Sequence, residues 1–224
     1  MGVADPEARG GLVVGGNAFA LALALSLKKL DIEVIVADTS WDNLRRVRMA
    51  RLRTYLGMVV SDDADRHLDL VGIGLLLALS HRAPLNALAC LRYASEFGSA
   101  QVFNVRIADM AERATKPAGR PLFEEDITLE RLEALILDHG FEIRHAKLTE
   151  EFDFLHMSAM QSNESVLLYA VSPEGAVRPF AGDRTFRAGP GWRIAYLDKS
   201  SRDKGDGGME ETAPSEDDIA RGRG

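Results

Sequence analysis

The feature that most constrains the fold is the stretch LVVGGNAFALALALSL, which covers Leu12 to Leu27. Three apolar residues precede two glycines and an asparagine, and a long run rich in Ala and Leu follows them. The short β-branched run is typical of a buried strand. The Ala/Leu run favours a helix that is buried on nearly all sides. The stretch therefore predicts a strand, a tight turn and a helix, which together open a βαβ unit.

The same alternation continues along the first half of the chain. We expect further apolar strands at 32–38, 57–60, 73–80 and 101–105, and helices at 41–55, 61–71 and 84–98. Strands with nearly continuous apolar character are typical of a parallel sheet covered by helices on both faces. Because crossovers between parallel strands are right-handed, the expected class is α/β, with a Rossmann-like doubly wound sheet.

The pattern changes after residue 118 and indicates a second unit. A helix at 129–138 is followed by short strands at 141–148, 165–172, 176–182 and 191–197, separated by turn sequences such as SPEG and AGPG. We therefore divide the chain into a loose N-terminus at 1–10, a Rossmann-like domain at 11–118, a small α+β domain at 119–198 and a tail at 199–224. The tail has almost no apolar residues, which predicts disorder.

Composition excludes several classes of partner. The chain has 224 residues and a formal net charge of −7, and an acidic protein of this kind is a poor nucleic-acid binder. Its longest apolar stretch, Leu12–Leu27, is interrupted at Gly15–Asn17 and is too short to span a bilayer, so we expect no direct membrane insertion. The single cysteine, Cys90, excludes an internal disulfide.

The glycine turn has several of the residues that a nucleotide site requires. Such a site needs a glycine after the first strand, a helix N-terminus facing the phosphates, and an acid after the second strand for the ribose. Gly15 has the first position, and Asp38 follows 23 residues later. Asn17 and Ala20 stand where the G-x-G-x-x-G pattern has glycine. These residues alone support equally a nucleotide site and a turn without a ligand.

Catalytic signatures are missing from the sequence. It has no G-x-S-x-G, H-E-x-x-H or C-x-x-C motif, and its five histidines lack metal-ligand spacing. We therefore expect neither an enzyme nor a metal site. Five arginines between 45 and 53 are interpreted first as a solvated helix face, with contact to a charged ligand or partner as the alternative.

The order of these features resembles the RCK domain, also called KTN or TrkA-N, which regulates potassium conductance. The resemblance rests on LVVGGNAFA, EVIVAD, VVSDDADRHLDLVGIG, LLLALS and LNALACLRYASEFG, with Gly72–Ile73 and Asn86 at matching positions. The stretches LDLVGIGLLLALS and QVFNV are closest to the C-terminal tail of NhaP-type cation:proton antiporters. Asn17 and Ser61 differ from the family pattern.

The resemblance implies a regulatory ligand-sensing module of a monovalent cation (sodium or potassium) antiporter or channel. It implies a homodimer on the cytoplasmic side of the membrane, held there through the transport unit, and a regulatory nucleotide: NAD(H), ATP, ADP or AMP. The implied binding residues lie at the phosphates, the ribose, the base and the crevice after the fourth strand; they are Gly15, Gly16, Asn17, Ala18, Phe19, Asp38, Thr39, Asp62, Asp63, Ala64 and Ser80. Two alternatives remain: a small NAD(P)-dependent oxidoreductase, and a dimerisation scaffold that binds no ligand.

Overall fold

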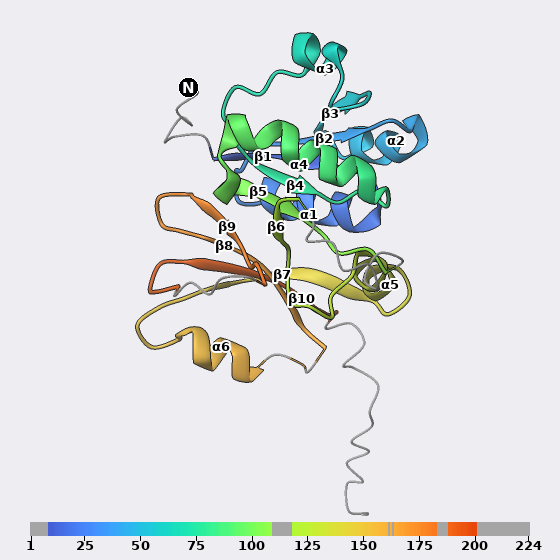
Figure 1. The fold of residues 1–224 in the computed structure, drawn as a ribbon. Helices are drawn as coiled ribbons and strands as arrows, with labels where there is room; N and C mark the ends of the chain where they lie inside the picture. Colours follow the sequence, from blue (N-terminus) through green and yellow to red (C-terminus); the bar gives the residue numbers. More distant parts are fainter. Residues whose placement is uncertain (1–8, 109–117, 161, 163, 183–187, 201–224) are drawn as a thin grey trace, which may run out of the picture.

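The computed structural model of the chain describes residues 9–108, 118–160, 162, 164–182 and 188–200. The predicted loose N-terminus and disordered tail fall almost entirely outside these residues. Within them, a parallel sheet and an antiparallel sheet are stacked with helices between and around them (Figure 1). No helix in the described part of the chain has the length and apolarity needed to cross a membrane.

The first sheet is parallel and has the strand order β3-β2-β1-β4-β5-β6, which confirms the predicted Rossmann-like class. Its strands are β1 (Gly10–Val14), β2 (Val34–Asp38), β3 (Arg53–Leu56), β4 (Ile73–Ala78), β5 (Val102–Asn104) and β6 (Arg120–Pro121). The helices of this half are α1 (Ala18–Lys28), α2 (Trp41–Met49), α3 (Asp62–His67) and α4 (Ala83–Phe97), with a 3₁₀ turn, η1, at Ser99–Gln101.

The second sheet is antiparallel and has the order β7-β10-β8-β9. Its strands are β7 (Phe141–Lys147), β8 (Val166–Val171), β9 (Val177–Pro179) and β10 (Arg193–Lys199), and two helices accompany it, α5 (Leu129–Leu137) and α6 (Phe154–Met160). The sequence predicted α5 and these four strands but not α6 or β6. Although Arg120 belongs to the predicted second domain, β6 pairs with β5 in the parallel sheet.

The third strand and the end of α2 differ from the prediction. The sequence predicted a helix to Tyr55 and a strand at 57–60, whereas α2 ends at Met49 and β3 spans Arg53–Leu56. The helix stops because Arg51 has a φ of +56°, and Lys28 Nζ donates to the carbonyls of Ala50 and Arg51. Arg53 therefore leaves the predicted helix face and pairs with Glu33 and Asp69.

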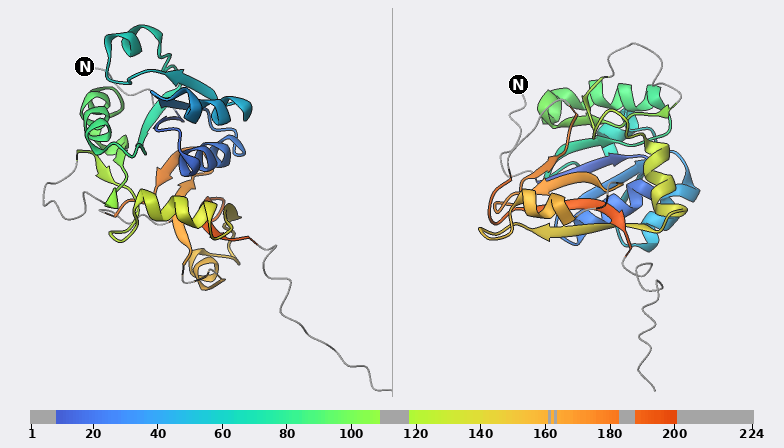
Figure 2. Two further views of the ribbon diagram at one scale, coloured as in Figure 1. Left: turned by 90° about the vertical axis from the view of Figure 1, so that its right-hand side faces the viewer. Right: turned by 90° about the horizontal axis from the view of Figure 1, so that it is seen from below.

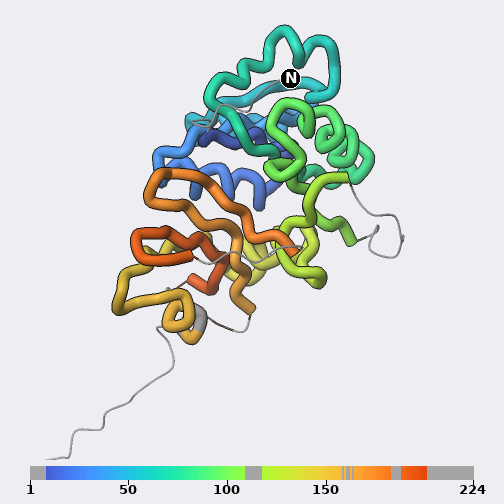
Figure 3. Tube along the Cα trace, turned by 60° about the vertical axis from the view of Figure 1, so that its left-hand side comes forward, coloured from blue at the N-terminus to red at the C-terminus, as the bar shows by residue number. Residues whose placement is uncertain are grey.

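Helix α1 lies between the two sheets (Figure 2), and this explains its composition. One core cluster contains Val13 of β1, Leu23 and Leu27 of α1, and Leu168 and Tyr169 of β8. A second cluster joins the other face of the parallel sheet to α3 and α4, and a third joins the antiparallel sheet to α6. The two predicted domains therefore share one core through α1. The Cα trace in Figure 3 shows the chain of the first half lying above that of the second half.

Candidate functional site

A crevice of about 210 Å³ lies at the carboxyl ends of the parallel strands, beside the glycine turn. Strands β2 and β4 pair with opposite edges of β1, so the strand order reverses at this point. In open α/β sheets, ligands bind at such a switch point. Of the predicted site residues, five line the crevice: Gly15, Asn17, Asp38, Thr39 and Ser80.

Gly15 forms the tight turn that the sequence predicted. Its φ is +111°, and a Cβ there would lie 2.7 Å from the carbonyl oxygen of Leu79. A side chain at this position would meet backbone atoms in a conformation that L-residues rarely adopt. The turn therefore requires glycine, and its backbone borders the crevice without a side chain in between.

Asp38 ends β2 and holds the turn through its carboxylate. Its Oδ2 accepts a hydrogen bond from the Gly16 amide at 2.7 Å and another from Asn43 Nδ2 at 3.1 Å. Its Oδ1 accepts from the Ser40 amide at 2.8 Å. The acid predicted for the ribose thus lies at the crevice, but it already bonds to protein donors.

Asn17 is the N-cap of α1. Its Oδ1 accepts from the Ala20 amide at 2.8 Å, and its Nδ2 donates to the Leu79 carbonyl at 2.6 Å. The asparagine that stands where the G-x-G-x-x-G pattern has glycine therefore joins the start of α1 to the end of β4. Ser61, the other departure, caps α3 in a similar way by accepting from the Ala64 amide.

Three helix N-termini meet at the crevice. The N-cap residues of α1, α2 and α4 are Asn17, Ser40 and Arg82, and all three line it. Each helix contributes a partial positive charge at its N-terminus. Asn86, which is fully buried, holds the loop after β4 in place by bonding to the Ser80 amide and carbonyl. The crevice is therefore suited to an anionic ligand.

Gly16 and Ala18 are not lining residues themselves but adjoin Gly15 and Asn17 in the glycine turn. The remaining four predicted site residues lie away from the crevice lining. Phe19 is buried and packs edge-on against Phe123, and Ala64 belongs to the core. Asp62 and Asp63 are exposed on α3. The Tyr55 hydroxyl donates to Asp63 at 2.8 Å, and this hydrogen bond lowers the pKa of the Asp63 carboxyl.

The sequence did not predict two residues that follow Ser80 in the loop after β4, or one residue of α5. His81 and Arg82 line the crevice, and their position directly after an apolar strand is a signal that was present in the sequence. Glu133 is different, because 115 residues separate it from Ala18, whose amide donates to its Oε1 at 3.1 Å. Its Oε2 lies 2.7 Å from His81 Nε2.

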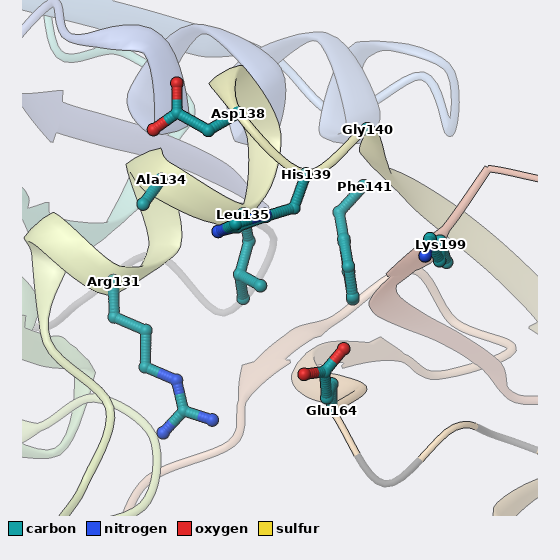
Figure 4. A pocket seen from close by; sticks show the side chains of 9 residues that line it. All are labelled: Arg131, Ala134, Leu135, Asp138, His139, Gly140, Phe141, Glu164 and Lys199. Atoms are coloured by element: carbon teal, nitrogen blue, oxygen red, sulfur yellow. The ribbon is translucent and has the colours of Figure 1, made fainter. Parts of the chain in front are cut away.

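A larger cavity, about 630 Å³, opens at the far end of α5 between Arg131, His139, Glu164 and Lys199 (Figure 4). Its lining includes both basic and acidic side chains, and it shares no lining residue with the crevice beside the glycine turn. Cys90 is a buried thiol, and burial raises its pKa to about 12. In the described ranges, no group of three or more His, Cys, Asp and Glu side chains is placed to hold a metal ion.

Comparison with known proteins finds similarity in structure only. No protein-family model and no curated protein matches the sequence. Among solved structures, the TrkA-N domain of the inner membrane protein YbaL from Escherichia coli is 16% identical, with a TM-score of 0.37, over 45% of this chain and 73% of that one. The NAD(P)-binding domain of an exopolyphosphatase-related protein from Archaeoglobus fulgidus is 16% identical, with a TM-score of 0.39, over 46% and 77%.

The GsuK RCK domain is 11% identical, with a TM-score of 0.44, over 89% of this chain and 46% of that chain. This chain thus spans less than half of the GsuK structure.

Proposed function

We propose that this chain is a regulatory module that senses a nucleotide in the crevice beside the glycine turn. The observation that carries the proposal is the convergence of the N-termini of α1, α2 and α4 on a crevice at the strand-order switch point. Helix N-termini favour phosphate groups, and the switch point is where open α/β sheets bind nucleotides. Asp38, at the end of β2, stands where the acid that hydrogen-bonds the ribose hydroxyls stands in such nucleotide sites.

The residues present fit the nucleoside half of such a ligand better than a whole dinucleotide. The volume of about 210 Å³ is below the range of about 300–1,000 Å³ usual for drug-sized ligands. In the proposed complex, Asp38 and Asn43 hold the ribose, and the bare turn at Gly15 lets the ligand approach the backbone. NAD(H), ATP, ADP and AMP share the adenosine that this arrangement would bind.

The sequence resemblance supports a cellular context for this activity. The proposed module regulates a monovalent cation:proton antiporter of the NhaP type, acts as a homodimer, and lies at the cytoplasmic face of the membrane through its transport unit. The ligand regulates transport only if it binds two states of the module with different affinity. The proposed role is regulatory rather than enzymatic.

Thermal unfolding of the full chain with NAD, NADH, ATP, ADP and AMP tests the proposed function. A ligand at 100 times its Kd stabilises the folded state by about 2.7 kcal/mol, which corresponds to roughly 5–10 °C in Tm for a chain of this size. We expect at least one of the five to raise Tm at millimolar concentration, and Asp38→Asn to reduce that shift. Asp31→Asn, an exposed acid on the α1–β2 loop, is the matched control.

If no nucleotide raises Tm, the chain is a scaffold and the sensing function is wrong. Turnover of NADH with a carbonyl substrate would instead support the oxidoreductase alternative.

A further inference from the structure

A carboxylate from the second unit lies at the first turn of α1. Glu133 projects from α5, its side chain is 17% exposed, and its two oxygens have different partners. Oε1 accepts from the Ala18 amide, and Oε2 lies within hydrogen-bond distance of His81 Nε2. Glu133 therefore connects α5, the start of α1 and the loop after β4 through one side chain.

The backbone donors that a phosphate would use are bonded to the protein's own oxygens. The Gly16 amide donates to Asp38, the Ala18 amide to Glu133 and the Ala20 amide to Asn17. Phosphate binding at a helix N-terminus depends on such free N–H groups. A phosphate and the Glu133 carboxylate are both anions, so they cannot share the Ala18 amide.

We propose that Glu133 is an internal competitor for the ligand's phosphate, and that a phosphorylated ligand binds by displacing it. This inference rests on the proposed function, because it describes how the same crevice selects its ligand. Displacement breaks the hydrogen bond that joins Glu133 of α5 to the Ala18 amide at the N-terminus of α1. Ligand binding thereby changes the connection between the two sheets, which is the differential contact that regulation requires.

Glu133 should therefore affect the binding of a nucleotide but not that of the corresponding nucleoside. In the wild-type protein, ADP can bind only to molecules in which Glu133 has left the Ala18 amide. The apparent affinity for ADP is therefore the intrinsic affinity multiplied by the fraction of such molecules. Adenosine has no phosphate and does not need the Ala18 amide, so Glu133 leaves its affinity unchanged. Glu133→Gln keeps an acceptor for Ala18 but removes the charge, whereas Glu133→Ala removes both.

Isothermal titration of the full chain with ADP and with adenosine tests this. We expect ADP to bind at least about tenfold more tightly to Glu133→Ala than to wild type, with Glu133→Gln between them, and adenosine to bind all three equally. Asp138→Asn removes a charge of the same sign from the exposed far end of α5. This control should leave both affinities unchanged.

Hydrogen exchange gives a second readout that does not depend on a variant. In wild type, ADP should speed amide exchange in α5, and adenosine should not. Thermal melting first shows whether the Glu133 variants are folded. If folded variants bind ADP no more tightly than the wild type does, the inference is wrong. Adenosine binding in the same experiment would leave the proposed function standing. If neither ligand binds any variant, both proposals fail.

Discussion

Gly15 is the residue whose identity the backbone fixes most tightly. Two features exclude a side chain here: the positive φ of Gly15, and the Leu79 carbonyl, which lies where a Cβ would be placed. The positive φ costs a non-glycine residue about 1–3 kcal/mol. The close contact would be with a backbone carbonyl, which has little room to move. No such constraint applies to Gly11 in β1, whose Cβ would lie 3.9 Å from a Leu75 methyl group.

We therefore predict that Gly15→Ala lowers the free energy of unfolding by about 2–4 kcal/mol, measured by urea denaturation. Gly11→Ala, the control, should change it by less than about 1 kcal/mol. Equal effects of the two substitutions would show that the turn is not conformationally restricted.

Asn17 shows how a residue that breaks a sequence motif acquires a role in the structure. From the sequence, Asn17→Gly is predicted to strengthen nucleotide binding, and that remains a prediction. The structure adds a cost, since glycine cannot cap the Ala20 amide or donate to the buried Leu79 carbonyl. An unpaired buried carbonyl costs about 1–3 kcal/mol.

Asn17→Gly should accordingly lower stability by about 1–3 kcal/mol in urea denaturation. An unchanged unfolding midpoint would mean that water replaces both hydrogen bonds and that the cap contributes nothing. Because of the lost stability, its nucleotide affinity must be measured well below its Tm.

Helix α1 packs against both sheets, and the hydroxyl of its one serine, Ser26, contacts the antiparallel sheet. Ser26 is 3% exposed. Its Oγ lies 2.6 Å from the Tyr169 hydroxyl of β8 and 2.9 Å from His145 Nε2 of β7. Burial lowers the pKa of His145, and the nearby charges of Lys29 and Arg193 lower it further. The folded protein therefore holds this imidazole neutral at pH values where the unfolded chain protonates it.

This pKa shift predicts an acid-sensitive interface. The ordinary pKa of histidine is about 6.5. Below that pH, the unfolded chain binds a proton at His145 that the folded chain does not. The free energy of unfolding therefore falls as the pH falls from about 6.5 towards the lower pKa of the folded protein. His145→Gln keeps a polar side chain but cannot titrate, and it should flatten the Tm profile between pH 7 and 5.5. His139, which is exposed after α5, provides the control substitution His139→Gln. A wild-type profile no steeper than that of His145→Gln would contradict the assignment.

How far the sequence predicts this molecule depends on whether the deciding interaction is local. The strand–turn–helix at 12–27 and the strand end at Asp38 follow from neighbouring residues, and they were predicted. The end of α2 depends on a positive φ at Arg51 and on Lys28, 23 residues earlier, so the helix was predicted too long. Glu133 reaches Ala18 only through the packing of α5 on α1, which no local pattern encodes.

At the scale of the whole molecule, the two predicted domains are not independent. Leu23 and Leu27 of α1, Phe123 from the segment before α5, and Leu168 and Tyr169 of β8 belong to one core cluster. Removing the second half would expose a continuous apolar face of α1, and exposed patches of that kind favour aggregation.

A chain truncated after residue 118 should therefore fail to unfold cooperatively and should aggregate on size-exclusion chromatography. A monomeric fragment with a sharp thermal transition would show that the Rossmann-like half folds alone and that α1 does not need the antiparallel sheet.

We propose that a nucleotide binds at the glycine turn with its phosphate at the start of α1. An amide chemical-shift titration of the isotope-labelled full chain with ADP tests this directly. We expect the largest changes to fall on Gly16, Asn17 and Ala18, with a second group in α5 around Glu133. Changes confined to the larger cavity around Arg131 and Lys199, or no changes at millimolar ADP, would contradict it.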